Sequence, residues 1–141
     1  LLTKNKIKLK IIGNQKIFSK KLKKLLNDSE NKTKKFKKLQ INLALNYGSK
    51  SEIISAIKAV YKKKKLLTEK NIEKNLYTKN IPNPDLLIRT GNTNRLSNFL
   101  LWQLAYTEIF FHKKLWPDFN SKDYKKILIK FRLLKRNFGS I

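Results

Sequence analysis

Short strands and helical segments alternate along this chain, and this alternation most limits the folds that it can adopt. The expected strands share runs of aliphatic or aromatic residues near turn residues, at residues 6–12, 39–45, 85–89 and 108–111. Helices are expected at residues 18–26, 49–61 and 121–136, where apolar residues recur at helical spacing. A more polar helix is expected from Thr68 onward, and another at residues 97–105, after the strand at 85–89. This order predicts an α/β fold with a largely parallel sheet flanked by helices.

A single domain across residues 1–141 is expected, because this length suits one domain with a real core. Residues 27–38 are interpreted as a polar linker. Ser49 and Glu52 form a candidate capping box. The helix that they would open is expected to bury Ile53, Ile57, Val60 and Tyr61.

Arginine is rare in this chain, so each arginine invites a reason that lysine could not satisfy. The chain has 30 Lys and 4 Arg, and Arg89 and Arg95 flank one loop. A guanidinium binds phosphate oxygens bidentately, and anions favour helix N-termini at the carboxyl ends of strands. Because Ser97 stands where a helix N-cap would stand, the pattern predicts a diphosphate-binding loop. From the spacing alone, two surface arginines beside a capped helix are an equally good interpretation.

A long ordered series of residues extends from this loop. Residues 89–103 read Arg-Thr-Gly-Asn-Thr-Asn-Arg-Leu-Ser-Asn-Phe-Leu-Leu-Trp-Gln, followed by Ala-Tyr-Thr-Glu at 105–108 and Leu-Trp-Pro-Asp-Phe at 115–119. The series resembles the signature of the cis-prenyltransferases, specifically the undecaprenyl diphosphate synthases. Ile-Ile-Gly at 11–13, Asn-Tyr-Gly at 46–48 with Lys50, and Arg-Asn-Phe-Gly at 136–139 follow the family's order too.

The resemblance implies an enzyme that joins isopentenyl diphosphate to an allylic diphosphate such as farnesyl diphosphate, with Mg²⁺, as a homodimer with a parallel α/β sheet. It implies that Arg89, Arg95, Leu96 and Ser97 bind isopentenyl diphosphate. It also implies that Glu108 helps to hold Mg²⁺, reaching toward the partner subunit's site. Oxygen ligands from few carboxylates, phosphates and water suit Mg²⁺.

The resemblance covers only the C-terminal part of the family, whose catalytic aspartate would lie upstream of residue 1. The chain also departs from the family pattern at three places. Asn92 and Thr93 stand where the family usually has Gly and Glu, Lys50 replaces an arginine, and Asn137 stands where an Arg-x-Gly motif would begin. These changes leave a second interpretation open, a non-catalytic partner subunit or a decayed remnant.

The net charge of +25 would ordinarily suggest a nucleic-acid partner. Lysine and 15 Asn dominate, as in proteins of A/T-rich genomes, and residues 1–80 carry 23 Lys and Arg against 5 acidic residues, mostly away from the motif. The lysine runs lack the interleaved aromatic residues that single-stranded nucleic acid needs. A solvated face is the favoured interpretation and nucleic acid is not expected, whereas weak attraction to anionic lipid, and hence peripheral membrane association, stays open.

Several residue types and patterns that the sequence lacks limit the classes of protein to which it can belong. The chain has no Cys, which excludes disulfides and thiolate metal sites, and no apolar run approaches the ~18 residues of a membrane span. A soluble, cytoplasmic protein is therefore expected. The chain also has no Met, so we expect a fragment of a longer polypeptide. His112, the one histidine, is expected to pack or lie on the surface rather than act as a general base.

Overall fold

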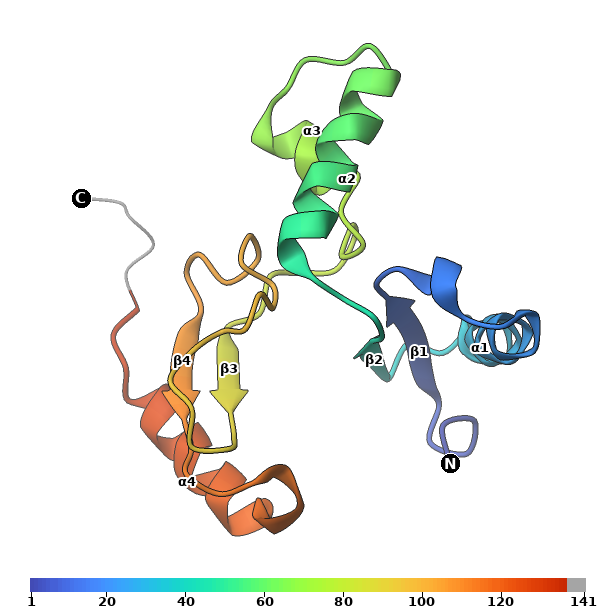
Figure 1. Cartoon of the computed structure of the whole chain (residues 1–141). Helices are drawn as coiled ribbons and strands as arrows, with labels where there is room; N and C mark the ends of the chain where they lie inside the picture. The colour runs from blue at the N-terminus through green and yellow to red at the C-terminus, as the bar shows by residue number, and fades with distance from the viewer. Residues whose placement is uncertain (137–141) are drawn as a thin grey trace. The chain divides into compact units, whose positions relative to one another are not determined.

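The computed structural model describes residues 1–136, and parallel strand pairs with flanking helices make up its two units (Figure 1). Leu1–Asn80 form unit 1 and Ile81–Ile141 form unit 2. Unit 1 contains β1 (Ile7–Ile12), η1 (Gln15–Ile17), α1 (Lys20–Thr33), β2 (Leu39–Ala44), α2 (Ser49–Lys62) and α3 (Glu69–Glu73). Unit 2 contains β3 (Leu86–Arg89), β4 (Glu108–Phe111), η2 (Trp116–Asp118) and α4 (Ser121–Arg132). The parallel α/β prediction is confirmed, while the single domain stays a prediction.

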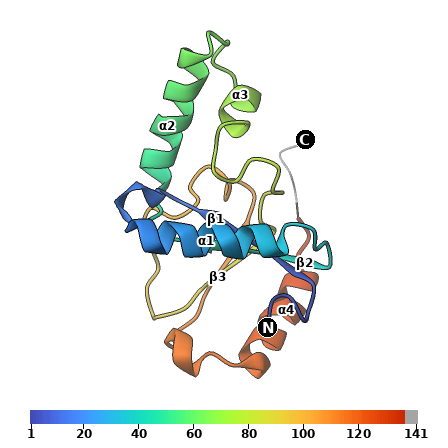
Figure 2. The same cartoon turned by 90° about the vertical axis from the view of Figure 1, so that its right-hand side faces the viewer.

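In unit 1, β1 and β2 pair in parallel from Ile7 opposite Leu39 to Ile12 opposite Ala44. Helix α1 packs beside β1, as both views show (Figures 1 and 2). Its Thr33 Oγ1 and Glu30 Oε1 accept hydrogen bonds from the Leu9 and Ile11 N–H groups, at 3.1 and 2.8 Å. These side chains accept hydrogen bonds from backbone N–H groups on the edge of β1 that would otherwise pair with a neighbouring strand.

The other long helix of unit 1, α2, packs against the short helix α3. Ala56, Val60 and Ile72 are buried between these segments. Thr68 caps α3 by accepting a hydrogen bond from the Asn71 N–H at 3.2 Å, which confirms the helix expected from this residue.

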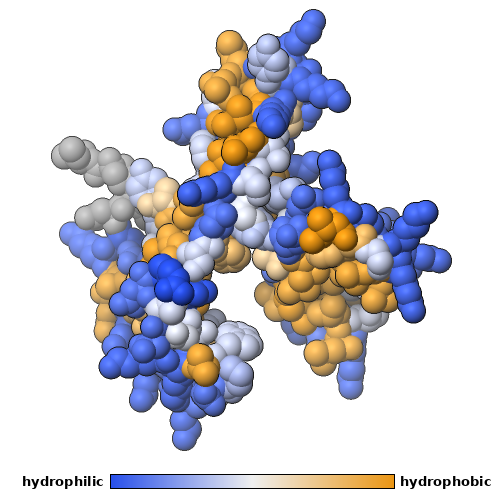
Figure 3. All heavy atoms as spheres, viewed as in Figure 1, coloured by the Kyte–Doolittle hydropathy of each residue, from blue (hydrophilic) through white to orange (hydrophobic). Residues whose placement is uncertain are grey.

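One face of the β1–β2 pair stays exposed within unit 1. Leu39, Ile41 and Leu43 alternate along β2 and so share one face, and all three are exposed. Hydrophobic atoms gather over this strand pair, beside hydrophilic atoms over α1 (Figure 3). Parallel sheets usually have both faces covered, so this face is unusual for its class.

In unit 2, β3 and β4 pair in parallel from Leu86 opposite Glu108 to Arg89 opposite Phe111. Helix α4 begins at a capping box, in which the Asn120 side chain accepts from the backbone of Asp123 and the Asp123 side chain accepts from the backbone of Asn120. Ile127 is its buried residue. The strands expected at 85–89 and 108–111 are thus confirmed, and the last helix ends at Arg132 rather than at residue 136.

The helix expected at residues 97–105 is wrong. Residues 97–106 form successive turns, and Ser97, Asn98 and Leu100 have φ values of 50°, 61° and 47°. A residue with positive φ cannot continue a right-handed helix, and Ser and Asn hold such turns through local side-chain bonding. Isolated turn bonds replace the helical ladder, such as Phe99 N–H to Leu96 O at 3.0 Å and Leu104 N–H to Leu100 O at 3.0 Å.

Three smaller predictions in unit 1 are also wrong. Residues 27–33 belong to α1 rather than to a linker, because their inner side chains bond β1. The N-cap of helix α2 is Gly48, which makes no side-chain cap bond, so the helix is not opened by Ser49 as its N-cap. Tyr61, expected to be buried, is 86% exposed near the end of that helix.

Candidate active site

Arg89 ends β3, so its side chain starts at the carboxyl end of a parallel strand. It is half-buried, and its Nε donates a hydrogen bond of 3.1 Å to Thr93 Oγ1. Among residues 1–136, no hydrogen bond occupies its two terminal nitrogens. The guanidinium is therefore anchored at one end while its fork stays available to an anion.

The loop after Arg89 is tied to the segment that follows β4. The Gly91 N–H donates to Lys114 O at 2.8 Å, and the Asn92 N–H donates to His112 O at 3.2 Å. The His112 N–H donates in turn to Arg89 O at 2.7 Å. Gly91 and Asn92 both have positive φ, at 95° and 54°. These bonds hold the loop at the carboxyl ends of both strands.

The other residues predicted to bind isopentenyl diphosphate lie further along the same loop. Arg95 is exposed, and within residues 1–136 its guanidinium forms no hydrogen bond or ion pair. Leu96 is half-buried and Ser97 is exposed. Because Ser97 is not a helix N-cap, anion binding here rests on guanidinium groups and loop donors rather than on a helix N-terminus.

Glu108 lies at the other end of the strand pair. It is the first residue of β4, opposite Leu86, whereas Arg89 pairs with Phe111. Three residues along a strand separate these ends by about 10 Å. The Glu108 N–H donates to Asp85 O at 3.1 Å, at the start of β3. Glu108 and the arginine loop of one chain thus lie at opposite ends of the strands.

Arg136 lies at the Glu108 end as well. Its Nη1 donates to Asp85 Oδ1 at 2.7 Å, and its Nη2 donates to Tyr106 O at 3.4 Å. Asn137 to Gly139, the segment that stands where the family has its Arg-x-Gly motif, lie outside the described residues. Glu108, which the resemblance assigns to the partner subunit's site, and Arg136 therefore share one end of the unit.

Glu108, the predicted Mg²⁺ ligand, does not lie beside the arginine loop of its own chain. Within the described part of the chain, no three His, Cys, Asp or Glu residues are grouped closely enough to hold a metal ion. Glu108 is separated from the loop by the length of the strands. The role of Glu108 in binding Mg²⁺ therefore stays a prediction.

Unit 1 presents a similar edge after its own strands. The Leu45 N–H donates to Ile12 O at 2.9 Å, and the Asn14 N–H donates to Asn46 O at 3.1 Å. Asn46 Nδ2 returns a bond of 2.8 Å to Asn14 O. These bonds join the loops that follow β1 and β2, where ligands of open α/β folds bind. Lys50, two residues beyond Gly48, is exposed at this edge.

The family model described as putative undecaprenyl diphosphate synthase matches residues 1–139. The chain belongs to the undecaprenyl diphosphate synthase family. An isoprenyl transferase of Thermotoga maritima is 39% identical, across 100% of this chain and 63% of that protein. An isoprenyl transferase of Aquifex pyrophilus is 43% identical, across 96% of this chain and 59% of that protein. The resemblance seen in the sequence is thereby confirmed.

Two solved structures of this fold are similar to the chain. A probable undecaprenyl diphosphate synthase from Campylobacter jejuni has a TM-score of 0.88 and 41% identity, covering 97% of this chain and 65% of that one. Lavandulyl diphosphate synthase from Lavandula x intermedia, solved with dimethylallyl diphosphate, has a TM-score of 0.89 and 35% identity, covering 99% of this chain and 64% of that one. The chain thus spans less than two thirds of these synthases.

Sequence reasoning missed the burial of the Glu52 carboxylate. Glu52 is 1% exposed, and its carboxylate accepts hydrogen bonds from the Tyr47 hydroxyl and, at 2.6 Å, from the Tyr77 N–H. It therefore holds the Asn-Tyr-Gly loop against the segment after α3. Its place on the apolar side of α2, near Ala56, was the signal that could have found it.

A cluster around His112 was missed as well, although the expectation of a packing role agrees with the structure. The His112 ring contacts Phe119 edge to face at 5.1 Å, and its Nε2 lies 3.9 Å from Asp123 Oδ1. Lys114 Nζ lies 2.8 Å from Asp123 Oδ2. The hydrogen bond from Lys114, followed by that from the Asn120 N–H, lowers the pKa of the Asp123 carboxyl. The capping-box spacing of Asn120 and Asp123 could have found this anchor.

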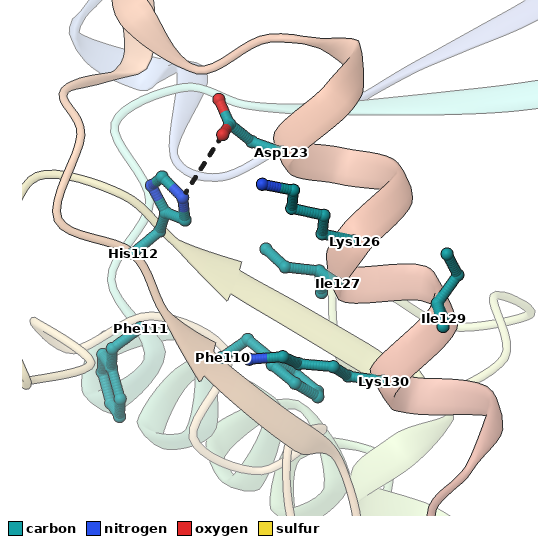
Figure 4. Close-up of a pocket in the computed structure, with 8 residues that line it drawn as sticks. All are labelled: Phe110, Phe111, His112, Asp123, Lys126, Ile127, Ile129 and Lys130. Atoms are coloured by element: carbon teal, nitrogen blue, oxygen red, sulfur yellow. Dashed lines mark ion pairs between the residues drawn. The ribbon is translucent and has the colours of Figure 1, made fainter.

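This cluster borders a cavity of about 390 Å³ between β4 and α4 (Figure 4). Phe110 and Ile127 line it, and Lys126 and Lys130 project from α4 beside them. The cavity therefore has apolar walls with cations from one helix. Within residues 1–136, no helix is both long and apolar enough to cross a membrane.

Proposed function

We propose that the natural polypeptide containing these residues is a cis-prenyltransferase, which condenses isopentenyl diphosphate with an allylic diphosphate such as farnesyl diphosphate. Its product is a long-chain polyprenyl diphosphate of the undecaprenyl class, and this chain carries the isopentenyl diphosphate site. The observation that carries the proposal is the pair of guanidinium groups with uncommitted donors at the carboxyl end of β3. The enzyme works in the cytoplasm and at the periphery of the membrane, where its lipid product belongs.

In this proposal Arg89 and Arg95 bind the diphosphate and fix the position of the isopentenyl double bond. Arg89 is preoriented by Thr93, so little conformational entropy remains to be lost when it binds. Arg95 supplies a second fork from the exposed part of the loop. Such positioning lowers the barrier because the reacting carbon atoms are already held in the correct geometry.

Homodimer formation is part of the proposal, because Glu108 and Arg136 lie at the end remote from their own arginine loop. In a dimer, Glu108 of one copy would contribute to the site of the other copy. There it would supply a carboxylate oxygen to Mg²⁺, a metal that needs only one or two carboxylates besides phosphate oxygens and water.

The arginine assignment is tested by Arg95→Lys in the natural polypeptide. An ammonium keeps the charge but makes a point contact, so we expect kcat/KM for isopentenyl diphosphate to fall about tenfold. Arg132→Lys is the matched control, because Arg132 is exposed on α4. Steady-state kinetics with both variants decide the question, and equal effects would refute the role of Arg95.

The assignment of Glu108 to the neighbouring site is tested by mixing two defective copies. One copy carries Arg95→Ala and the other carries Glu108→Gln. A mixed dimer then contains one site with both residues intact, so coexpression should restore up to about a quarter of the activity if the copies pair at random. If Glu108 served its own chain, the mixture would be as inactive as either variant alone.

A second function is favoured by Asn92 and Thr93, which stand where the family usually has Gly and Glu. It is a non-catalytic partner subunit or a decayed remnant. Intact mass and N-terminal sequence of the natural polypeptide separate the two functions. A longer chain with the family's aspartate loop supports the synthase, whereas a product of these residues alone supports the subunit or remnant.

A further inference from the structure

The outer side of α1 exposes aliphatic side chains. Leu26 and Thr33 face β1 and are buried, whereas Leu22 and Leu25 are 37% and 63% exposed. Ile17, in the turn before the helix, is 70% exposed. In Figure 2 this helix lies in front of β1. Apolar side chains exposed together on one segment indicate an interaction surface.

Lysines surround these aliphatic residues. A groove of about 400 Å³ on α1 is lined by Ser19, Lys21, Leu22, Lys24, Leu25 and Asp28. Residues 16–25 contain 5 Lys and no acidic residue, and Glu30 further along the helix is turned inward to bond the Ile11 N–H. The outer side is therefore strongly cationic as well as aliphatic.

We propose that this face, Ile17 to Leu25 with its flanking lysines, docks the protein on an anionic lipid bilayer. Aliphatic side chains of an amphipathic helix enter the boundary between headgroups and acyl chains, while lysine stems lie along it and place their ammonium groups among lipid phosphates. Each lysine near an anionic surface adds attraction that salt screens.

A bilayer fits this face better than nucleic acid does. Helix α1 contains no aromatic residue on which a base could stack, and Phe18, the one aromatic residue of the face, is half-buried. Nucleic acid would also leave Leu25 and Ile17 without a role, whereas a bilayer buries them. The docking surface deepens the proposed function by naming where an enzyme with a lipid product meets the membrane.

The test is flotation of the natural polypeptide with vesicles of phosphatidylcholine alone or mixed with phosphatidylglycerol, without substrate. We expect binding to the mixed vesicles that weakens with salt. Lys21→Glu with Lys24→Glu should lower the partition coefficient at least about tenfold, given roughly fivefold per lysine. Leu25→Ser should lower it by about fivefold or more, since a buried leucine side chain is lost.

Matched controls come from the same unit. Lys62→Glu with Lys65→Glu makes the same charge change on exposed residues at the end of α2, and Leu67→Ser removes a leucine that is also 63% exposed. Both controls should retain the original partition coefficient. The proposal is overturned if the controls lose as much binding as the α1 variants, if neutral vesicles bind equally, or if the α1 charge change abolishes binding to an RNA hairpin while vesicles do not bind.

Activity is measured separately on water-soluble short-chain substrates. Loss of turnover with intact vesicle binding would count against the proposed synthase and leave the docking surface standing. Retained turnover with no vesicle binding would overturn the docking surface and leave the proposed synthase standing.

Discussion

The two strand pairs share one plan, a parallel ladder whose following loops are bonded together, but they fix those loops by different means. In unit 1, Gly13 approaches Leu45 closely and the buried Glu52 holds Tyr47. In unit 2, backbone bonds and the Arg89–Thr93 contact hold the loop at the surface. Burial makes the first edge rigid, whereas exposure leaves the second edge with guanidinium donors for a ligand.

The difference teaches where substitutions should affect stability and where they should affect binding. A buried carboxylate is tolerable only when its hydrogen bonds are made, so the unit 1 edge has little tolerance for change. Substitutions in an exposed loop change the stability of the fold little, and the side chains of such a loop are available to bind a ligand.

Two glycines give the sharpest test of this contrast. A Cβ on Gly13 (φ 114°) would lie 2.2 Å from Leu45 O, whereas a Cβ on Gly91 (φ 95°) would meet only Leu115 Cδ2 at 4.0 Å. Gly13→Ala should lower the free energy of unfolding by about 3 kcal/mol or more, and Gly91→Ala by about 1 kcal/mol, because it suffers backbone strain without a clash. Urea unfolding of the natural polypeptide measures both. Equal losses would contradict the contrast.

The sequence predicted the strands better than the loops for a physical reason. Aliphatic alternation in Ile7–Ile12 and the apolar run in Glu108–Phe111 are patterns typical of strands, and the structure places strands there. The position of Ser97 as a candidate N-cap was misleading at residues 97–105, because a residue type cannot report the positive φ values at Ser97, Asn98 and Leu100.

The site residues were found through arginine scarcity and family resemblance, yet their arrangement was not. Neither signal indicates that Glu108 and Arg89 lie at opposite ends of a strand pair, since that depends on the register of β3 against β4. The burial of Glu52 was not predicted, because a carboxylate three residues after a serine resembles a capping box. Its long-range bond to the Tyr77 N–H depends on the tertiary fold.

Removing the buried carboxylate of Glu52 should destabilise the unit 1 edge less than the clash introduced by Gly13→Ala. Glu52→Ala leaves the Tyr47 hydroxyl and the Tyr77 N–H without this acceptor, so we expect a loss of about 2–3 kcal/mol of unfolding free energy. Glu73→Ala, on the exposed side of α3, is the control and should change stability by less than about 0.5 kcal/mol. Urea unfolding of both variants measures the difference. A small effect of Glu52→Ala would mean that water replaces the carboxylate.

The smallest expected effect concerns the surface anchor of unit 2, which should respond to acid. The pKa of Asp123 is lowered below its ordinary 3.8, chiefly by the hydrogen bond from Lys114. Its stabilising contribution is therefore complete above about pH 4 and is lost as the pH falls through the folded pKa. Amide chemical shifts of Asn120, whose N–H donates to Asp123 Oδ2 at 3.1 Å, should move in that range.

Asp123→Asn should abolish this transition, and Asp118→Asn, which changes an exposed carboxylate in η2, should preserve it. The structural reason is that Asp123 holds the start of α4 to Lys114, whose carbonyl in turn accepts the Gly91 N–H of the arginine loop. Acid should thus loosen the loop of unit 2 through the Lys114–Asp123 ion pair. If the shift of Asn120 persisted in the Asp123 variant, another carboxylate would be the acid-sensitive group, and the two edges would differ less than their contacts indicate.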